Sequence, residues 1–167
     1  MAKNSKSLSK EQRDAIVAEL CKSYNMEIET VANYIACSTQ LDGMLAQTVK
    51  ASLSTDVAEE LGHAQQLAGR IKVLGGRVPG SQALKMNQSS LQPPKNNVDV
   101  EAVIKGVIEA EGGAIAQYEK IIELTDGVDH VTQDMCITLK GDEEEHLSEF
   151  QGFQREFEAM RKMFSGK

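Results

Sequence analysis

Four long stretches of this chain carry apolar residues at a helical period, and each stretch holds one glutamate where that period calls for an apolar residue. The apolar positions recur every three or four residues rather than every second one, which predicts amphipathic helices rather than strands. An ionised carboxylate in a helical core costs several kcal/mol unless a partner compensates it. The glutamates therefore constrain both the fold and the chemistry; they are Glu27, Glu60, Glu111 and Glu143.

Turn-forming residues divide the chain into four predicted helices. Ser9-Lys10-Glu11-Gln12 resembles a capping box and predicts the start of the first helix. Glycine-containing turns follow the first three stretches, and prolines between the second and third stretches prevent a continuous helix there. We therefore predict an all-α fold with helices at about residues 9–41, 45–74, 97–126 and 129 onward, and a long connection at 75–97.

The predicted connections are short, long and short. A single long crossover between the second and third helices distinguishes this four-helix bundle from an up-down-up-down bundle. The candidate residues also repeat, at a spacing of 84 residues for one glutamate pair and 83 for the other pair and for the histidines: Glu27 with Glu111, Glu60 with Glu143, and His63 with His146. We expect one domain over residues 1–167, built from two similar helical hairpins.

Two of the glutamates begin a Glu-x-x-His motif, on the second and fourth predicted helices. Residues three apart lie on one side of a helix, so the two side chains of each motif point the same way. One glutamate from each of two helices, with Glu-x-x-His from the other two, is the arrangement of di-iron and di-manganese carboxylate sites. We predict a site for two metal ions formed by Glu27, Glu60, His63, Glu111, Glu143 and His146.

The ligand types narrow the choice of metal. Carboxylates with two imidazoles suit pairs of Fe(II) or Mn(II) better than a tetrahedral zinc site or a calcium site. Glu109 is the alternative to Glu111, but only Glu111 lies on the apolar side of its helix. Tyr34 and Tyr118 each follow a candidate glutamate by seven residues. We expect their hydroxyls to bond to ligand carboxylates, with a redox role as the alternative.

The overall charge favours cations over polyanions as partners. The chain has 25 acidic and 18 basic residues, with a net charge of −7. The N-terminus differs, because residues 1–8 are expected to form a flexible tail carrying Lys3 and Lys6 ahead of Lys10. Such a tail leaves DNA binding open as a weaker alternative.

The cysteines and the apolar runs exclude several protein classes. Cys21, Cys37 and Cys136 are odd in number and form no CxxC motif, which argues against a disulfide framework or a rubredoxin-type iron site. Their role stays open. Apolar runs are too short to cross a bilayer, and the N-terminus has no signal-peptide core, so we expect a cytoplasmic protein without a membrane partner.

These motifs resemble the ferritin superfamily over nearly the whole chain. Glu27-Ile-Glu-Thr-Val-Ala-Asn-Tyr34, Glu60-Leu-Gly-His63 and Glu143-Glu-Glu-His146 are similar to the bacterioferritin site. That resemblance implies two Fe ions per subunit, with Glu60 and Glu143 bridging the metals and the other two glutamates terminal. Bacterioferritin has a haem-binding methionine at the position of Leu61, so no haem is expected.

The length after the last motif is more similar to Dps-like miniferritins. Too few residues follow His146 for a fifth helix, and the segment Tyr118-Glu-Lys-Ile-Ile-Glu-Leu-Thr-Asp-Gly127 supports the same resemblance. These relatives form hollow dodecamers, so we expect a homo-oligomer, with a 24-mer as the alternative. Many carry a cysteine pair near the metals, where this chain has Gly113 and Gln133.

The resemblance implies a ferroxidase that also stores and detoxifies iron. Such a protein oxidises Fe(II) with hydrogen peroxide or dioxygen at the di-iron site and keeps the ferric mineral inside the oligomer. Two alternatives remain. One is a Dps-type protein that protects DNA; the other is a non-storage di-iron or di-manganese peroxidase on the same bundle.

Overall fold

The computed structural model describes residues 8–165, which form four long α-helices and two short 3-10 helices. In chain order these are α1 (Lys10–Gln40), η1 (Met44–Ala46), α2 (Gln47–Val73), η2 (Ser81–Ala83), α3 (Val100–Thr125) and α4 (His130–Ser165). The predicted all-α bundle with one long crossover is confirmed. One boundary differs, because residues 44–46 form a separate 3-10 turn and α2 begins only at Gln47.

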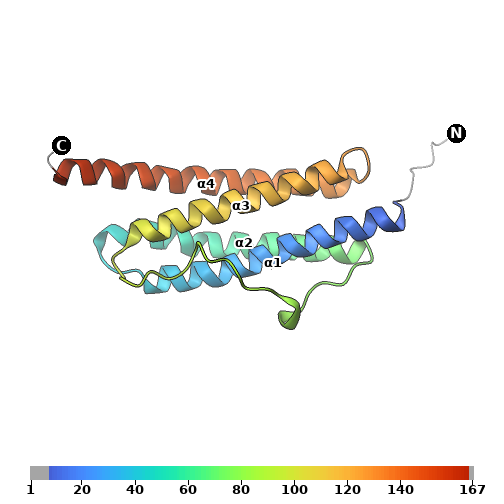
Figure 1. Ribbon diagram of the computed structural model, residues 1–167, viewed down its shortest axis with the longest axis horizontal. Coiled ribbons are helices and arrows are strands. Elements are labelled where there is room, and N and C mark those ends of the chain that lie inside the picture. The colour runs from blue at the N-terminus through green and yellow to red at the C-terminus, as the bar shows by residue number, and fades with distance from the viewer. Residues whose placement is uncertain (1–7, 166–167) are drawn as a thin grey trace.

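The four helices lie side by side along the long axis of the molecule, as two antiparallel hairpins (Figure 1). The hairpins are α1 with α2 and α3 with α4, and helix packing is most extensive within each of them. The crossover returns along the bundle from the end of α2 to the start of α3 (Figure 1). This is the arrangement of a ferritin-like bundle, in which a single long connection joins two hairpins.

Local capping explains where the helices begin and end. Ser9 and Gln12 form the predicted capping box, in which the Gln12 N–H donates to Ser9 Oγ at 3.1 Å and the Ser9 N–H donates to Gln12 Oε1 at 2.9 Å. Asp99 caps α3 by accepting the Ala102 N–H at 3.1 Å. Gly127, with φ of 63°, supplies the left-handed turn between α3 and α4.

Two apolar clusters form the core, one toward each end of the bundle. On each of the four α-helices, the glutamate predicted as a metal ligand lies in sequence between residues of one cluster and residues of the other. On α1, for example, Leu20 belongs to one cluster and Tyr34 to the other, with Glu27 between them. The buried acids therefore form a polar layer that apolar packing covers on both sides.

The crossover is held against α1 by side chains of that helix. Asn25 pairs with the backbone of Lys85, accepting its N–H at 2.6 Å and donating to its carbonyl at 3.0 Å. Glu29 accepts the N–H of Gln88 at 2.5 Å. These contacts satisfy backbone groups that have no strand or helix partner.

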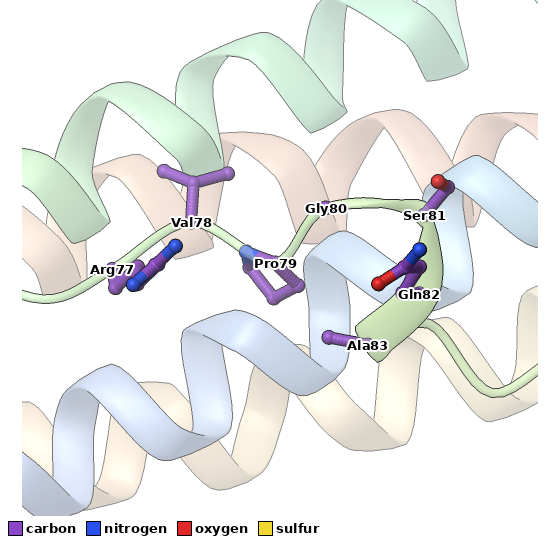
Figure 2. A pocket seen from close by; sticks show the side chains of 7 residues that line it. All are labelled: Arg77, Val78, Pro79, Gly80, Ser81, Gln82 and Ala83. Carbon is purple, nitrogen blue, oxygen red and sulfur yellow. The ribbon is translucent and has the colours of Figure 1, made fainter.

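The first part of the crossover borders a hollow of about 610 Å³ formed by residues 77–83. Figure 2 shows Val78 and Pro79 pointing to opposite sides of the chain. Val78 packs against the core cluster that contains Leu20. None of the six candidate ligands lines this hollow, so it is separate from the predicted metal site.

Two predictions concern features that the structure leaves untested. The tail at residues 1–8 lies, apart from Leu8, outside the described residues. The assignment of residues 1–167 to one domain stays a prediction. Within residues 8–165, no helix combines the length and apolar character that a membrane span requires.

Candidate metal centre

The six predicted ligands lie together in the polar layer between the two apolar clusters. Each of them is at most 6 % exposed. They form two overlapping groups, and within each group the possible ligand atoms lie within 4.8 Å of one another. Glu60 and Glu143 belong to both groups. The first group adds Glu27 and His63, and the second adds Glu111 and His146.

The inner nitrogens of both histidines face the two shared glutamates. Nδ1 of His63 lies 3.0 Å from Glu143 and 3.5 Å from Glu60. Nδ1 of His146 lies 3.4 Å from Glu143 and 3.5 Å from Glu60. The imidazole rings are stacked, with centroids 6.5 Å apart. The arrangement is thus two adjacent positions of similar composition, related by the repeat of the hairpins.

Several polar atoms in this cluster are buried without a hydrogen-bond partner: both carboxylate oxygens of Glu60, Oε2 of Glu143, Nε2 of His63 and Nδ1 of His146. Native proteins rarely leave such atoms unsatisfied, because each costs roughly 1–3 kcal/mol. Within residues 8–165, the ion pairs of Glu60 and Glu143 are all with histidine, not with lysine or arginine.

This donor set fits two divalent ions. Carboxylate oxygens are hard ligands, and imidazole suits iron. Four carboxylates also match the charge of two divalent cations. Metal ions bound between the shared glutamates would satisfy the unpartnered oxygens of Glu60 and Glu143 and Nδ1 of His146. The assignment of the six residues as metal ligands stays a prediction.

A buried tyrosine bonds to each of the remaining two glutamates. The hydroxyl of Tyr34 donates to Glu111, and the hydroxyl of Tyr118 donates to Glu27. Both tyrosines are fully buried. Each hydrogen bond joins α1 to α3, so the tyrosine orients the glutamate of the other hairpin and not the one earlier in its own helix.

Mutual repulsion and burial separate the acids into two classes. Burial, together with the charges of Glu60 and Glu143, raises the pKa of Glu27 and of Glu111 well above the usual value. Burial also acts to raise the pKa of Glu60, but the imidazoles of His146 and His63, whose Nδ1 atoms lie 3.5 Å from this carboxylate, outweigh it and bring this pKa to about 2. The same two histidines lower the pKa of Glu143 against the effect of burial.

The histidines respond in the opposite direction. Burial acts to lower their pKa values, but the carboxylates of Glu143 and Glu60 raise the pKa of His63 to about 10 and that of His146 to about 12. Without metal, the cluster therefore holds protonated imidazoles beside ionised Glu60 and Glu143. In Glu27 and Glu111 the same burial and repulsion favour the protonated form.

The residues considered as alternatives lie elsewhere. Glu109 is exposed and lines a groove beneath the crossover, whereas Glu111 faces the cluster. Gly113 lines the same groove. A Cβ atom at this position would lie 3.9 Å from the methyl carbon of Met26. Gln133 bonds to Asp126 at the turn between α3 and α4.

Sequence reasoning missed three acids beside the histidines. Glu59 and Asp56 form a group with His146, and Glu59 and Asp142 form a group with His63. The sequence does contain a signal for two of them, since Glu59 and Asp142 directly precede the two motif glutamates and share their spacing of 83 residues. In isolation, such acids resemble a solvated helix face.

Comparison with known proteins agrees with this architecture. The DNA protection during starvation protein of Pyrococcus furiosus is 25 % identical over 134 residues, which cover 79 % of this chain and 72 % of that protein. Among solved structures, a bacterioferritin-related protein of Bacteroides fragilis, described as a dodecameric thioferritin, has a TM-score of 0.78. Its sequence identity is 24 %, with 91 % of each chain covered.

A Dps protein of Vibrio cholerae O1, described as a ferritin-like diiron-carboxylate protein, also has a TM-score of 0.78. Its sequence identity is 16 %, and the match covers 92 % of this chain and 97 % of the Vibrio cholerae chain. At such identities the solved structures support the fold alone. The family model for the ferritin-like domain matches residues 17–160, and the chain therefore belongs to the ferritin-like family.

Proposed function

We propose that this protein is a ferroxidase that binds two ferrous ions per subunit and oxidises them with hydrogen peroxide or dioxygen. The observation that carries the proposal is the pair of buried, overlapping ligand groups that share Glu60 and Glu143. In the part of the chain that the structure describes, these two glutamates have no lysine or arginine partner. Manganese is the alternative metal, because the same donor set suits Mn(II).

The geometry suggests a different role for each kind of ligand. Glu60 and Glu143 belong to both groups, so they would bridge the two metal positions. Glu27 and Glu111 each belong to one group and would be terminal ligands, held by the tyrosine hydroxyls. His63 and His146 would each bind through Nδ1, the nitrogen that faces the shared glutamates.

Ferrous iron is the substrate, and two ferrous ions supply the two electrons that, with two protons from solvent, reduce one hydrogen peroxide to two waters. The protein holds the ions close together and lets carboxylates compensate the higher charge of the ferric product. Glu27 and Glu111 lose their protons when they become ligands, because a ligand carboxylate must be ionised. The apolar clusters on both sides exclude bulk water from the reacting positions.

Storage would require a hollow oligomer. We propose a homo-oligomer, with a dodecamer favoured over a 24-mer, because the Bacteroides fragilis relative is described as dodecameric. The ferric product would then collect as mineral inside the shell. The mass of the protein in solution, measured by light scattering, distinguishes twelve subunits from twenty-four or two.

The ferroxidase proposal is tested by removing the two shared glutamates. The Glu60→Ala/Glu143→Ala variant is expected to lose rapid Fe(II) oxidation in stopped-flow measurements. A matched control replaces two exposed acids of α4, Glu145 and Glu158, with alanine and keeps the wild-type rate. An unchanged rate in the Glu60/Glu143 variant would refute the assignment, and metal analysis of the same samples compares iron with manganese.

DNA binding is a second candidate, favoured by the name of the Pyrococcus furiosus relative. The lysines that would carry it, Lys3 and Lys6, lie outside the described residues. Repetition of a weakly binding tail in an oligomer would strengthen its interaction with phosphates. A gel shift at low salt, with and without residues 1–7, tests this function and leaves the Ser9 capping box intact.

A further inference from the structure

The outer nitrogens of the two histidines face acids that are not among the six candidate ligands. Nε2 of His146 lies 3.3 Å from Oε2 of Glu59, which is on α2. Nε2 of His63 lies 3.3 Å from Oδ2 of Asp142, which is on α4. Each pair joins α2 to α4. The histidine of one helix faces the acid that directly precedes the motif glutamate of the other helix.

Glu59 and Asp142 occupy the boundary between the buried cluster and solvent. Their side chains are 48 % and 36 % exposed, whereas those of His63 and His146 are 3 % and 7 % exposed. A partly exposed carboxylate remains hydrated and avoids the full cost of burying a charge. Both acids can therefore accept a hydrogen bond from a buried ring while they remain in contact with water.

An imidazole that binds metal through Nδ1 needs an acceptor at Nε2. Neutral imidazole has one lone pair, and its other nitrogen carries a proton. In this cluster Nδ1 of both rings faces Glu60 and Glu143, so Nε2 becomes the donor. Among residues 8–165, Nε2 of His63 is buried without a hydrogen-bond partner, and Oδ2 of Asp142 lies 3.3 Å from it.

We propose that Glu59 and Asp142 are positioning residues, which accept hydrogen bonds from Nε2 of His146 and His63 and so keep both Nδ1 atoms directed toward the metal ions. This inference rests on the proposed function. A carboxylate behind a histidine ligand fixes the tautomer and the ring orientation, and it makes the ligand nitrogen more basic.

The same acids could instead hold a further cation. The possible ligand atoms of Glu59, His63 and Asp142 do lie within 4.8 Å of one another. A cation there would need the lone pair of Nε2, which the ring does not have while Nδ1 binds the inner metal. The chemistry of imidazole therefore favours hydrogen-bond acceptors over a second site.

The test compares Co(II) binding by the full-length wild type with binding by Glu59→Ala and Asp142→Ala. Each variant is expected to bind Co(II) roughly 10- to 100-fold more weakly. The visible absorption bands of the bound Co(II) should also change, because the ring is no longer fixed. Glu59→Gln and Asp142→Asn keep an acceptor oxygen and should recover most of the affinity. Glu145→Ala, an exposed acid on α4, is the control with wild-type affinity.

Three results would overturn the inference. Alanine variants with the affinity and spectrum of Glu145→Ala would show that neither acid positions a ligand. Amide variants as weak as the alanine variants would show that only the charge matters. Anomalous diffraction from Co(II) at the carboxylates of Glu59 and Asp142 would make them metal ligands.

Failure of the proposed function has a different signature. In that case the wild type itself binds no Co(II) between Glu60 and Glu143, and the inference fails with it. Circular dichroism and thermal unfolding of the metal-free variants verify that all of them fold.

Discussion

Tyr34 on α1 donates a hydrogen bond to the carboxylate of Glu111 on α3, and so connects the two hairpins of the bundle at the candidate metal centre. Tyr118 makes the reciprocal bond to Glu27. Both pairs are buried, and each glutamate belongs to only one of the two ligand groups. The tyrosines thereby orient the proposed terminal ligands before metal binds.

Removal of either hydroxyl should destabilise the metal-free protein. Tyr34→Phe and Tyr118→Phe each leave a buried carboxyl group without its donor, which costs about 1–3 kcal/mol. Urea unfolding measures the loss. Tyr24→Phe is the control, because this half-buried residue of α1 makes no side-chain hydrogen bond to any residue between 8 and 165. Equal stability of all three variants would contradict the proposed role.

Metal binding should release protons and strengthen as the pH rises. Burial raises the pKa of Glu27 and Glu111, while Glu143 and Glu60 raise the pKa of His63 to about 10 against the effect of burial. His63 and His146 are therefore protonated at neutral pH in the metal-free protein, and the raised pKa values of Glu27 and Glu111 favour their protonated form. Metal ligands must be deprotonated, so binding displaces up to about four protons per subunit.

Isothermal titration calorimetry in buffers with different ionisation enthalpies measures this release. Between about pH 5 and pH 8, affinity should increase, because fewer protons compete with the metal. The Glu27→Gln variant should release about one proton fewer. Binding heats that do not depend on the buffer would rule out the predicted protonation of the cluster.

Replacement of Asp56 by asparagine should stabilise the metal-free protein at neutral pH. Burial, with the charges of Glu149 and Glu60, raises the pKa of Asp56 from 3.8 to about 6. Between these values the folded state binds more protons than the unfolded state, so stability falls as the pH rises through this window. Neutral asparagine avoids the loss.

The expected gain for Asp56→Asn at pH 7 is up to about 2 kcal/mol, with almost no gain near pH 3, which lies below both pKa values, so that the proton is mostly bound in both states of the wild type. Chemical unfolding at the two pH values measures the difference. Asp134→Asn, at an exposed position of α4, is the control and should change stability by less than about 0.5 kcal/mol. A gain that does not depend on pH would point to a different cause.

Gly106 should be the glycine of α3 that cannot be replaced. A Cβ at this position would lie 2.6 Å from the carbonyl oxygen of Ser90 and 3.1 Å from the Cα of Leu91, both backbone atoms of the crossover. Gly106→Ala is expected to destabilise the protein by about 1–3 kcal/mol, because the crossover must move.

Gly112→Ala is the matched control on the same helix, where a Cβ meets nothing within 4 Å. Alanine is the better helix former, so this variant should gain about 0.5–1 kcal/mol. Thermal unfolding of the two variants compares them directly. Similar Tm values would mean that the crossover does not need the close approach to α3.

Local sequence patterns predicted the helices and the composition of the polar layer. Helical period and turn residues act locally, which is why the predicted ends at Ser9, Leu41 and Leu74 lie within one residue of α1 and α2 in the structure. A carboxylate inside an apolar stripe is so costly that its position already indicates a partner. The positions of four glutamates within apolar stretches therefore predicted them as ligands before the helix packing was known: Glu27, Glu60, Glu111 and Glu143.

Contacts between side chains of different helices could not be predicted in this way. A helical period assigns a residue to a face, but the contact across a bundle depends on the rotation and axial shift of two helices joined by a long crossover. Tyr34 therefore bonds to Glu111 and not to Glu27 of its own helix. Asp142 of α4 likewise lies 3.3 Å from His63 of α2. The two helices carry equivalent motifs and run in opposite directions (Figure 1).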